Sequence, residues 1–370
     1  MGNIADRDGC TGCEVCMAAC EKKAIEMIKD DLTGFVYPFI DESKCVDCGI
    51  CREICPQMKN EGDVPSGDNP KIYAVIAKED DIRDNSTSGG AFALFAREVL
   101  AKKGAVCGAM YDENLQVFHG IITDMNELSK MMKSKYMQSR MVMAYEDIDK
   151  KLNDGMTVLF CGTPCQCEAV KRFVHLKGKD DQLILIDLLC RGIPSPLYFH
   201  KYSRELEERF GKKITGVDFK NKSKGWHNLG IVYKFDDGEV WYESGHDSDM
   251  ALSFIKYDYC VRDSCFMCKY KQRRRISDLT IGDFWRMPDT DWDDDRGTSV
   301  VFINTEKGNT LFEQIREKIR CKEFDFDTVY KGNIPALTNL ENRKEERYRF
   351  FSFLQNHSFR ETMVMMENKR

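Results

Sequence analysis

CTGCEVCMAAC (10–20) and CVDCGICREICP (45–56) are two copies of one cysteine pattern. In each copy three cysteines are separated by two residues, and a fourth follows after three more. The second copy begins 35 residues after the first. Structural zinc usually takes two cysteine pairs that lie far apart, whereas this compact spacing wraps one corner of an iron–sulfur cubane. The pattern therefore predicts two [4Fe–4S] clusters in the first sixty residues.

The ligands of each cluster come from both copies, because the fourth cysteine of such a run binds the other cluster. Gly12 and Gly49 lie inside the two loops, where the backbone must approach the cluster closely. This spacing predicts cluster one at Cys10, Cys13, Cys16 and Cys55, and cluster two at Cys45, Cys48, Cys51 and Cys20.

Composition places the chain among globular proteins. It has 370 residues, 42% hydrophobic and 31% charged, which is enough for two or three domains. No apolar run reaches the length of a membrane span, and the N-terminus lacks the apolar region of a signal peptide. We therefore expect a cytoplasmic protein, in which disulfides explain seventeen cysteines poorly. The net charge of −6 gives no reason to expect a nucleic-acid partner.

The rest of the chain alternates strand-like and helix-like segments. Residues 61–70 (EGDVPSGDNP) are polar and rich in proline and glycine, which predicts a linker. The alternation after it predicts an α/β body, a mixed sheet covered by helices. Strands are expected at 71–78, 104–111, 115–123, 156–162, 182–190, 230–235 and 300–305, and helices at 90–103, 195–210 and within 341–370.

Four segments of unusual composition are interpreted as loops. NSTSGGAF (85–92) brings small side chains to a helix start, which suits an anion or a planar cofactor; alone, an ordinary N-cap explains it more simply. The others are KSKYMQS (133–139), RGIPSP (191–196) and RISDLTIGDFW (275–285). Known nucleotide-binding, hydrolase and metalloprotease motifs are missing. The basic stretch KYKQRRR (269–275) is read as solvated surface, with an anion site as the alternative.

Six motifs occur in an order that resembles a known family. They are SxSGG, SKYxQS, F-x-GTPCQ, DLLC-x-G-x-PSP, C-x2-C-x-Y and R-x-SDLT-x-GDFW. Together they resemble the coenzyme F420 hydrogenase/dehydrogenase beta-subunit family, which includes F420-reducing hydrogenase beta subunits, F420H2 dehydrogenase input subunits and 7-hydroxymethyl chlorophyll a reductase. Residues 1–60 resemble the bacterial two-cluster ferredoxins. The chain departs from the family at Arg191, often His, at Arg286, often Gly, and at CEAV (167–170).

The resemblance implies the domain organisation. An α+β ferredoxin-like N-terminal domain, two short hairpins with two helices, precedes an α/β flavin-binding body. The implied boundaries are a ferredoxin domain at 1–60, a linker at 61–70, the N-terminal region of the beta-subunit family at 71–155, and its C-terminal region with a helical tail at 156–370.

The resemblance also implies FAD. A flavin takes up a hydride as two electrons and passes electrons on singly, so it can convert between hydride donors and iron–sulfur clusters. A cation near the reduced ring would stabilise its negative charge, for which Lys135 is the first catalytic candidate and Arg275 the second. The other cofactor-binding residues implied are Ser86, Ser88, Gly89 and Gly90 against the ring, Thr163 and Gly282 lining the site, and Asp283 orienting the cation or a flavin hydroxyl.

FCGTPCQC (160–167) raises the question of a third metal site. Cys161 fits apolar packing, since it continues the inward pattern of a strand. Cys165 fits it poorly, because it follows Gly-Thr-Pro at a turn, where a side chain can face a site. A disulfide within the stretch is possible but disfavoured in a cytosolic chain built around clusters.

Other cysteines complete this third site. Cys190 ends the next predicted strand, and parallel neighbours would bring both strand ends to one edge of the sheet. A C-x2-C pair at 265–268 has the spacing that grips one cluster corner. A third [4Fe–4S] cluster is thus predicted at Cys165, Cys190, Cys265 and Cys268, with Cys260 in reserve and tetrahedral zinc at the same sulfurs as the main alternative.

Three functions compete at this stage. The first is an FAD- and iron–sulfur-dependent oxidoreductase that acts on a small organic substrate such as F420 or NAD(P)H and exchanges electrons with a ferredoxin or a partner subunit. The second is an electron-transfer subunit of a larger complex without an activity of its own. The third is a ferredoxin fused to a flavin-free binding module.

Overall fold

The computed structural model describes residues 4, 7–58, 69–289 and 291–368. The predicted linker at 61–70 falls largely outside them. Among the described residues no helix has the length and apolar character needed to cross a membrane.

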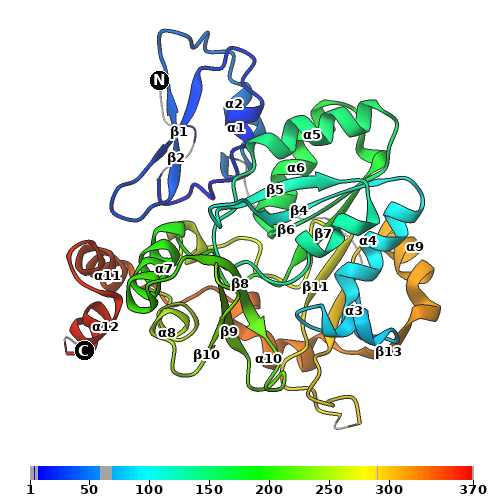
Figure 1. Cartoon of the computed structure of the whole chain (residues 1–370). Coiled ribbons are helices and arrows are strands. Elements are labelled where there is room, and N and C mark those ends of the chain that lie inside the picture. The colour runs from blue at the N-terminus through cyan, green and yellow to red at the C-terminus, as the bar shows by residue number, and fades with distance from the viewer. Residues whose placement is uncertain (1–3, 5–6, 59–68, 290, 369–370) are drawn as a thin grey trace.

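The N-terminal module is small and lies against the body (Figure 1). Its two strands, β1 (Ile25–Lys29) and β2 (Val36–Ile40), form an antiparallel pair, and two short helices, α1 (Val15–Ala18) and α2 (Ile50–Ile54), carry the cysteine repeats. Both helices begin after a residue in the left-handed region, Glu14 at φ 63° and Gly49 at φ 77°. Only one of the two expected hairpins is present in the described residues.

The body is built on an eight-stranded mixed sheet, as expected. Strands β11, β7, β6 and β4 run parallel, and antiparallel strands flank them on both sides. The order is β13 (Ile319–Phe324), β3 (Lys71–Ala77), β12 (Ser299–Ile303), β11 (Leu279–Asp283), β7 (Leu183–Leu188), β6 (Val158–Gly162), β4 (Ala105–Tyr111) and β5 (Val117–Ile122).

Helices cover both faces of this sheet. Leu159 on β6 packs with α4 (Ala91–Ala101) and α9 (Glu306–Ile315) on one face. Its neighbours Val158 and Phe160 point to the other face, towards α5 (Val142–Asn153) and α6 (Pro164–Leu176), as period-two alternation requires. The remaining helices of the body are α3 (Asp80–Asp84) and α10 (Phe326–Leu337), with Pro335 inside the latter.

A second sheet and four helices form a separate core beside the large sheet. Strands β8 (Ile214–Asn221), β9 (Gly230–Phe235) and β10 (Val240–Ser244) are antiparallel. The C-terminal tail forms two packed helices rather than the one expected, because a capping box at Ser358 starts a new helix. The four helices are α7 (Pro196–Phe210), α8 (Asp249–Ile255), α11 (Lys344–Asn356) and α12 (Phe359–Glu367).

The reading of residues 275–285 as a loop is wrong, because they contain β11 in the middle of the sheet. The polar residues of this segment are typical of loops, but in the structure they lie in or beside the sheet and form hydrogen bonds. Asn304 donates to the Thr280 hydroxyl at 3.0 Å, and the Leu185 amide donates to the Asp278 carboxylate at 2.8 Å. Just past this strand, Arg286 adopts φ 56°, a conformation that favours glycine.

The N-terminal module is joined to the body by buried polar contacts. The Glu14 carboxylate accepts hydrogen bonds from the amides of Met141 and Val142 at the start of α5, at 2.7 and 2.8 Å. Nearby, the Tyr145 hydroxyl donates to the Cys13 carbonyl at 2.8 Å. Gln138 donates its amide to the carbonyl of Gly12 at 3.0 Å. The module is therefore seated in a fixed orientation.

Candidate metal and cofactor sites

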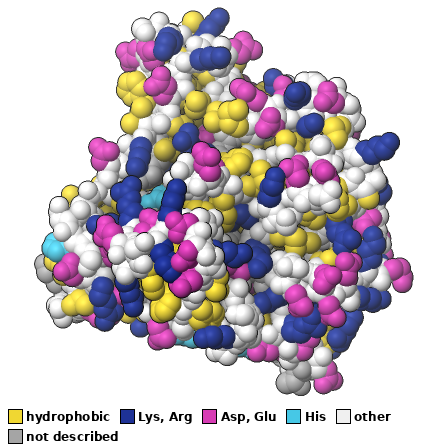
Figure 2. Space-filling view, viewed as in Figure 1, with side chains coloured by type: hydrophobic (Ala, Val, Ile, Leu, Met, Phe, Trp, Pro, Cys, Tyr) yellow, Lys and Arg dark blue, Asp and Glu magenta, His cyan; other side chains and the backbone are white. Residues whose placement is uncertain are grey.

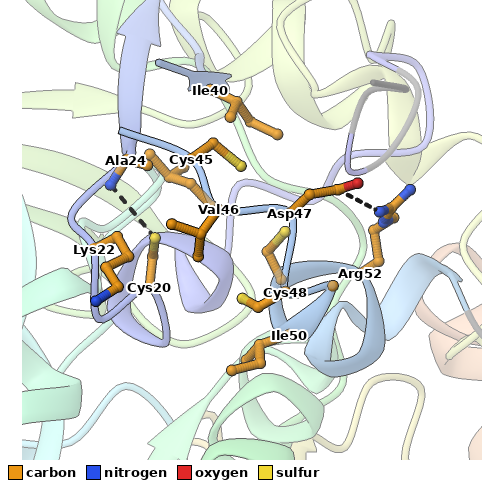
Figure 3. Close-up of a pocket in the computed structure, with 13 residues that line it drawn as sticks. Cys20, Lys22, Ala24, Ile40, Cys45, Val46, Asp47, Cys48, Ile50 and Arg52 are labelled. Atoms are coloured by element: carbon orange, nitrogen blue, oxygen red, sulfur yellow. Dashed lines mark hydrogen bonds and ion pairs between the residues drawn. The ribbon is translucent and has the colours of Figure 1, made fainter. Parts of the chain in front are cut away.

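The cysteines predicted for cluster two surround one pocket of the N-terminal module. Figure 3 shows Cys20, Cys45 and Cys48 around it, and Cys51 also lines it. The Ala24 amide donates to the Cys20 sulfur at 3.4 Å, the kind of contact that tunes a cluster. Cys48 is exposed, so this pocket opens to solvent.

The cysteines predicted for cluster one lie deeper, towards the body. Cys10, Cys13, Cys16 and Cys55 are all buried. Burial raises the pKa of the Cys13 thiol, and the nearby thiols of Cys10, Cys55 and Cys165 raise it further. The last of these belongs to the body, so cluster one adjoins the predicted third site.

The four cysteines predicted for the third site line one pocket. Strands β6 and β7 are parallel neighbours, as expected, and place Cys165 and Cys190 at one edge of the sheet. Thr163 caps α6, and its hydroxyl lies 3.2 Å from the Cys165 sulfur. Cys165, Cys190, Cys265 and Cys268 all line this pocket, which is open to solvent on one side.

These thiols influence one another's ionisation. Burial raises the pKa of Cys190 to about 12 and that of Cys265 to about 11, and in both cases neighbouring cysteines of the same pocket add to the rise. Binding a metal would have to displace these protons. As positioned, no three His, Cys, Asp or Glu side chains of the described residues form a group that could hold a metal ion.

The remaining cysteines near these motifs serve packing. Cys260, the reserve ligand, is fully buried in the apolar core between α7, α8 and α11, and it does not line the pocket. The Cys167 thiol is also fully buried and donates to the Ile186 carbonyl at 3.4 Å. Cys161, half-buried, packs against the core around α4.

The SxSGG loop is held tightly by the sheet. The Ser86 hydroxyl donates to the Ile82 carbonyl, and the Ser88 hydroxyl to that of Thr298, both at 2.7 Å. A Cβ on Gly89 would lie 2.1 Å from the Val75 carbonyl oxygen. Packing between strands therefore already explains the small residue at this position.

Gly90 has φ 94°, so only glycine suits this position at the start of α4. Like Gly89, it is explained by the backbone alone. Their assignment to a flavin ring stays a prediction.

Several of the motif loops nevertheless meet. Thr87 of SxSGG contacts Ser134 of the 133–139 loop at 3.3 Å. Ser139 of the same loop accepts a hydrogen bond from Gln166 of GTPCQ at 2.8 Å. The Lys220 ammonium on β8 lies 5.6 Å from the ring centre of Tyr136, again in that loop. The 133–139 loop is thus the meeting point.

Lysines missed by the sequence analysis surround this convergence. Lys220 pairs with Asp283 and lies 5.5 Å from the ring centre of Trp285, so it joins the GDFW motif. Lys222 donates to the Ser88 carbonyl at 3.2 Å, and Lys133 pairs with an aspartate on β8. The basic run KNKSK at 220–224 is the sequence signal that could have revealed two of them.

Lys135 and Arg275, the two predicted catalytic cations, belong to different surroundings. Lys135 donates to the Met132 carbonyl at 2.9 Å, and burial lowers its pKa to about 8. Arg275 is buried, pairs with Asp187 at 3.0 Å and lines the cysteine pocket. The structure therefore places only Lys135 in the loop where the motifs meet.

The other predicted residues are divided in the same way. Thr163 is the cap beside Cys165 and belongs to the cysteine pocket. Gly282 is close-packed, because a Cβ there would lie 2.8 Å from Leu189. Asp283 pairs with Lys220, whereas the predicted cation Arg275 pairs with Asp187, so the assignment of Asp283 to a flavin site stays a prediction.

One buried group at the convergence is suited to a bound cofactor. The Trp226 indole N–H is buried and has no hydrogen-bond partner among the residues described. Its ring stacks on Trp285 at 4.4 Å, and it lies beside Gly297, which also adjoins Ser88. An unpaired buried donor is costly, and a ligand atom that accepted from this N–H would remove the cost.

Two parts of the chain match known protein families. Residues 155–328 match the family model for the C terminus of the coenzyme F420 hydrogenase/dehydrogenase beta subunit, and residues 9–58 match a 4Fe-4S dicluster domain. The C-terminal part of the body is therefore similar to that of the F420 hydrogenase/dehydrogenase beta subunits. The N-terminal module is an iron–sulfur domain, so the protein is an electron-transfer protein.

A solved structure shares the fold. It is a xenon derivative of the F420-reducing [NiFe] hydrogenase complex from Methanosarcina barkeri, in which one chain aligns with a TM-score of 0.53 and 15% identity. The alignment covers 79% of the present chain and 96% of that chain. The comparison with curated proteins found no match for this chain.

Proposed function

We propose that the protein is an iron–sulfur flavoprotein oxidoreductase that couples hydride transfer at FAD to one-electron transfer through three [4Fe–4S] clusters. The observation that carries the proposal is the succession of three cysteine sets from the surface to the body. Cys48 is exposed at one end, and Cys13 of cluster one lies in the same apolar core as Cys165 of the body. Clusters held by these sets would give electrons a route between the surface and the body.

The third cluster would be held by Cys165, Cys190, Cys265 and Cys268. The chemistry of this donor set fits a [4Fe–4S] cluster, and the side chains as positioned would have to move closer together to bind it. Four thiols converge on one pocket, and the Ile193 amide donates to the Cys265 sulfur at 3.4 Å. Arg275 and Lys271 also line this pocket, and their positive charges would offset the negative charge of the thiolates.

The flavin would be held where the 133–139 loop, the SxSGG loop and the GDFW motif meet. When bound, FAD supplies the hydride chemistry. Lys135 and Lys220 supply positive charge beside the site, Asp283 holds Lys220 in place, and the Trp226 N–H is free to donate to a flavin oxygen or nitrogen.

Iron content tests the third cluster directly. Two ferredoxin-type clusters account for about eight irons and a third would bring the total to about twelve. Cys165→Ala should lower iron and sulfide by about a third and leave the ferredoxin signals in place. Cys260→Ala is the matched control, because this buried cysteine lies outside the pocket and should leave iron unchanged. About eight irons with one zinc per wild-type chain would show that we named the wrong metal.

Anaerobic purification with flavin identification tests the proposed flavin site. The isolated chain should contain FAD, and F420H2, NAD(P)H or another hydride donor should bleach it in stopped flow. Lys220→Met should weaken FAD retention. Lys201→Met should not, because this partly exposed lysine on α7 pairs with Glu205 of the same helix. A fully reconstituted protein without a flavin spectrum would refute the flavin site.

The alternative is an electron-transfer subunit of a larger complex. Apolar side chains exposed on the N-terminal module favour it (Figure 2), and two of them, Val46 and Ile50, line the pocket of cluster two. Phe39 is 58% exposed and Val46 60%, and such a patch marks a protein contact. Turnover that appears only after a partner subunit is added would support this alternative.

A further inference from the structure

Arg262 is a buried cation at the junction of the module and the body. Its side chain is 1% exposed, and its three hydrogen bonds all reach neutral acceptors. It donates to the carbonyl of Cys10 at 2.6 Å, to the carbonyl of Val36 at 2.9 Å, and to the side-chain oxygen of Gln138 at 2.8 Å. None of the carboxylates in the described parts of the chain forms an ion pair with it.

The same guanidinium lies between two cysteine sets. Its contact with Cys10 ties it to the loop of cluster one, and it also lines the pocket of the third site. The Arg262 carbonyl accepts a hydrogen bond from the Cys265 amide at 3.0 Å, so the arginine belongs to the turn that carries this cysteine. The rings of Tyr37 and Phe35 lie over the guanidinium at 4.3 and 5.1 Å, which excludes water.

A buried charge needs compensation, since burying an isolated ion is strongly unfavourable. Cation–π contacts and carbonyl dipoles provide part of it. Four thiolates on an iron–sulfur core carry net negative charge, and such sites adjoin Arg262 on two sides. Reduction adds one electron, and so one further negative charge, to a cluster.

We propose that Arg262 is an electrostatic bridge whose charge is balanced by cluster one and by the third cluster. Because the clusters balance its charge, the attachment of the module to the body depends on bound clusters. In turn, the positive charge of Arg262 stabilises the reduced state of the clusters beside it. The part that concerns the third cluster rests on the proposed function, whereas the part that concerns cluster one rests on the dicluster domain.

Gly12 supports this role of the arginine. It has φ 65°, and a Cβ there would lie 2.8 Å from an Arg262 nitrogen and 2.1 Å from the Gln138 amide nitrogen. The loop of cluster one thus leaves room for the guanidinium. A neighbouring arginine, Arg347, is buried but paired with Asp263 at 3.0 Å, so its charge has a carboxylate partner.

The test is a redox titration of the reconstituted full-length protein, followed by electron paramagnetic resonance, with dithionite as the electron donor. Arg262→Gln should lower the reduction equilibrium constant of cluster one by about tenfold, or about 59 mV for one electron. Cluster two is the internal reference, because its pocket does not include Arg262. Arg262→Lys keeps the charge and should restore most of the potential, although it cannot make all three hydrogen bonds.

Arg347→Gln is the matched control. It should reduce stability without moving the potential of cluster one. An unchanged potential in Arg262→Gln at full iron content would overturn the proposal, as would an equal shift in Arg347→Gln. If the wild-type protein contains only about eight irons per chain, the proposed third cluster is refuted. The reduction potential of cluster one then still decides whether Arg262 has the proposed role.

Discussion

Glu14 offers the sharpest test of how the module is attached to the body. Its side chain is fully buried and accepts the two free amides at the start of α5, from Met141 and Val142. Arg140 adds an ion pair from the partly exposed side. Glu14→Ala removes all three interactions and leaves two buried backbone donors unpaired.

The expected loss follows from these contacts. A hydrogen bond to a charged group contributes about 1.5–3 kcal/mol, and breaking a buried pair costs about 3–5 kcal/mol. We therefore expect Glu14→Ala to lower the free energy of unfolding by about 3–5 kcal/mol. Glu14→Gln keeps the shape and one acceptor oxygen, so its loss should be roughly half as large.

The assay is anaerobic urea unfolding of the reconstituted protein, followed by visible iron–sulfur absorbance and tryptophan fluorescence. Asp8→Asn is the matched control, because Asp8 also joins the module to the body but forms an exposed pair with Lys344. Exposed pairs contribute little, so its midpoint should hardly move. If Glu14→Ala shifts the midpoint no more than Asp8→Asn, the reasoning is refuted.

Gly12→Ala should loosen the same junction, since its Cβ would overlap Gln138, and iron retention under chelator should fall. Asp187→Asn breaks a buried pair with Arg275 and should lower stability by about 3–5 kcal/mol in thermal unfolding; an unchanged Tm would contradict this. Because burial lowers the pKa of Lys135 from 10.5 to about 8, the folded state binds fewer protons between these values, and the free energy of unfolding should rise with pH there. Lys135→Met should flatten that rise, and an identical slope would count against it. Cys48→Ala should slow transfer to an external one-electron partner while leaving hydride exchange intact, and equal rates would reject cluster two as the port.

Local patterns predicted the metal chemistry and most elements of the sheet. Cysteine spacing within one loop directly determines how thiols are presented, so the ferredoxin repeat could be recognised without a fold. The adjacency of Cys165 and Cys190 was also predictable, because parallel strands bring their ends together. Strand β11 escaped detection, since its polar residues are satisfied by partners elsewhere in the sheet.

The sequence by itself determined that the N-terminal module is an iron–sulfur domain, and it predicted the cluster ligands from short spacings that local backbone geometry enforces. Only the tertiary structure decided how the sites are joined. Arg262 meets Cys10 across 252 residues, and Glu14 meets the start of α5 across more than 120. Such contacts follow from the packing of the module on the body, and no local periodicity encodes them. The lysines around the proposed flavin site were hidden for the same reason, because Lys220 is recognisable only once β8 lies beside Asp283.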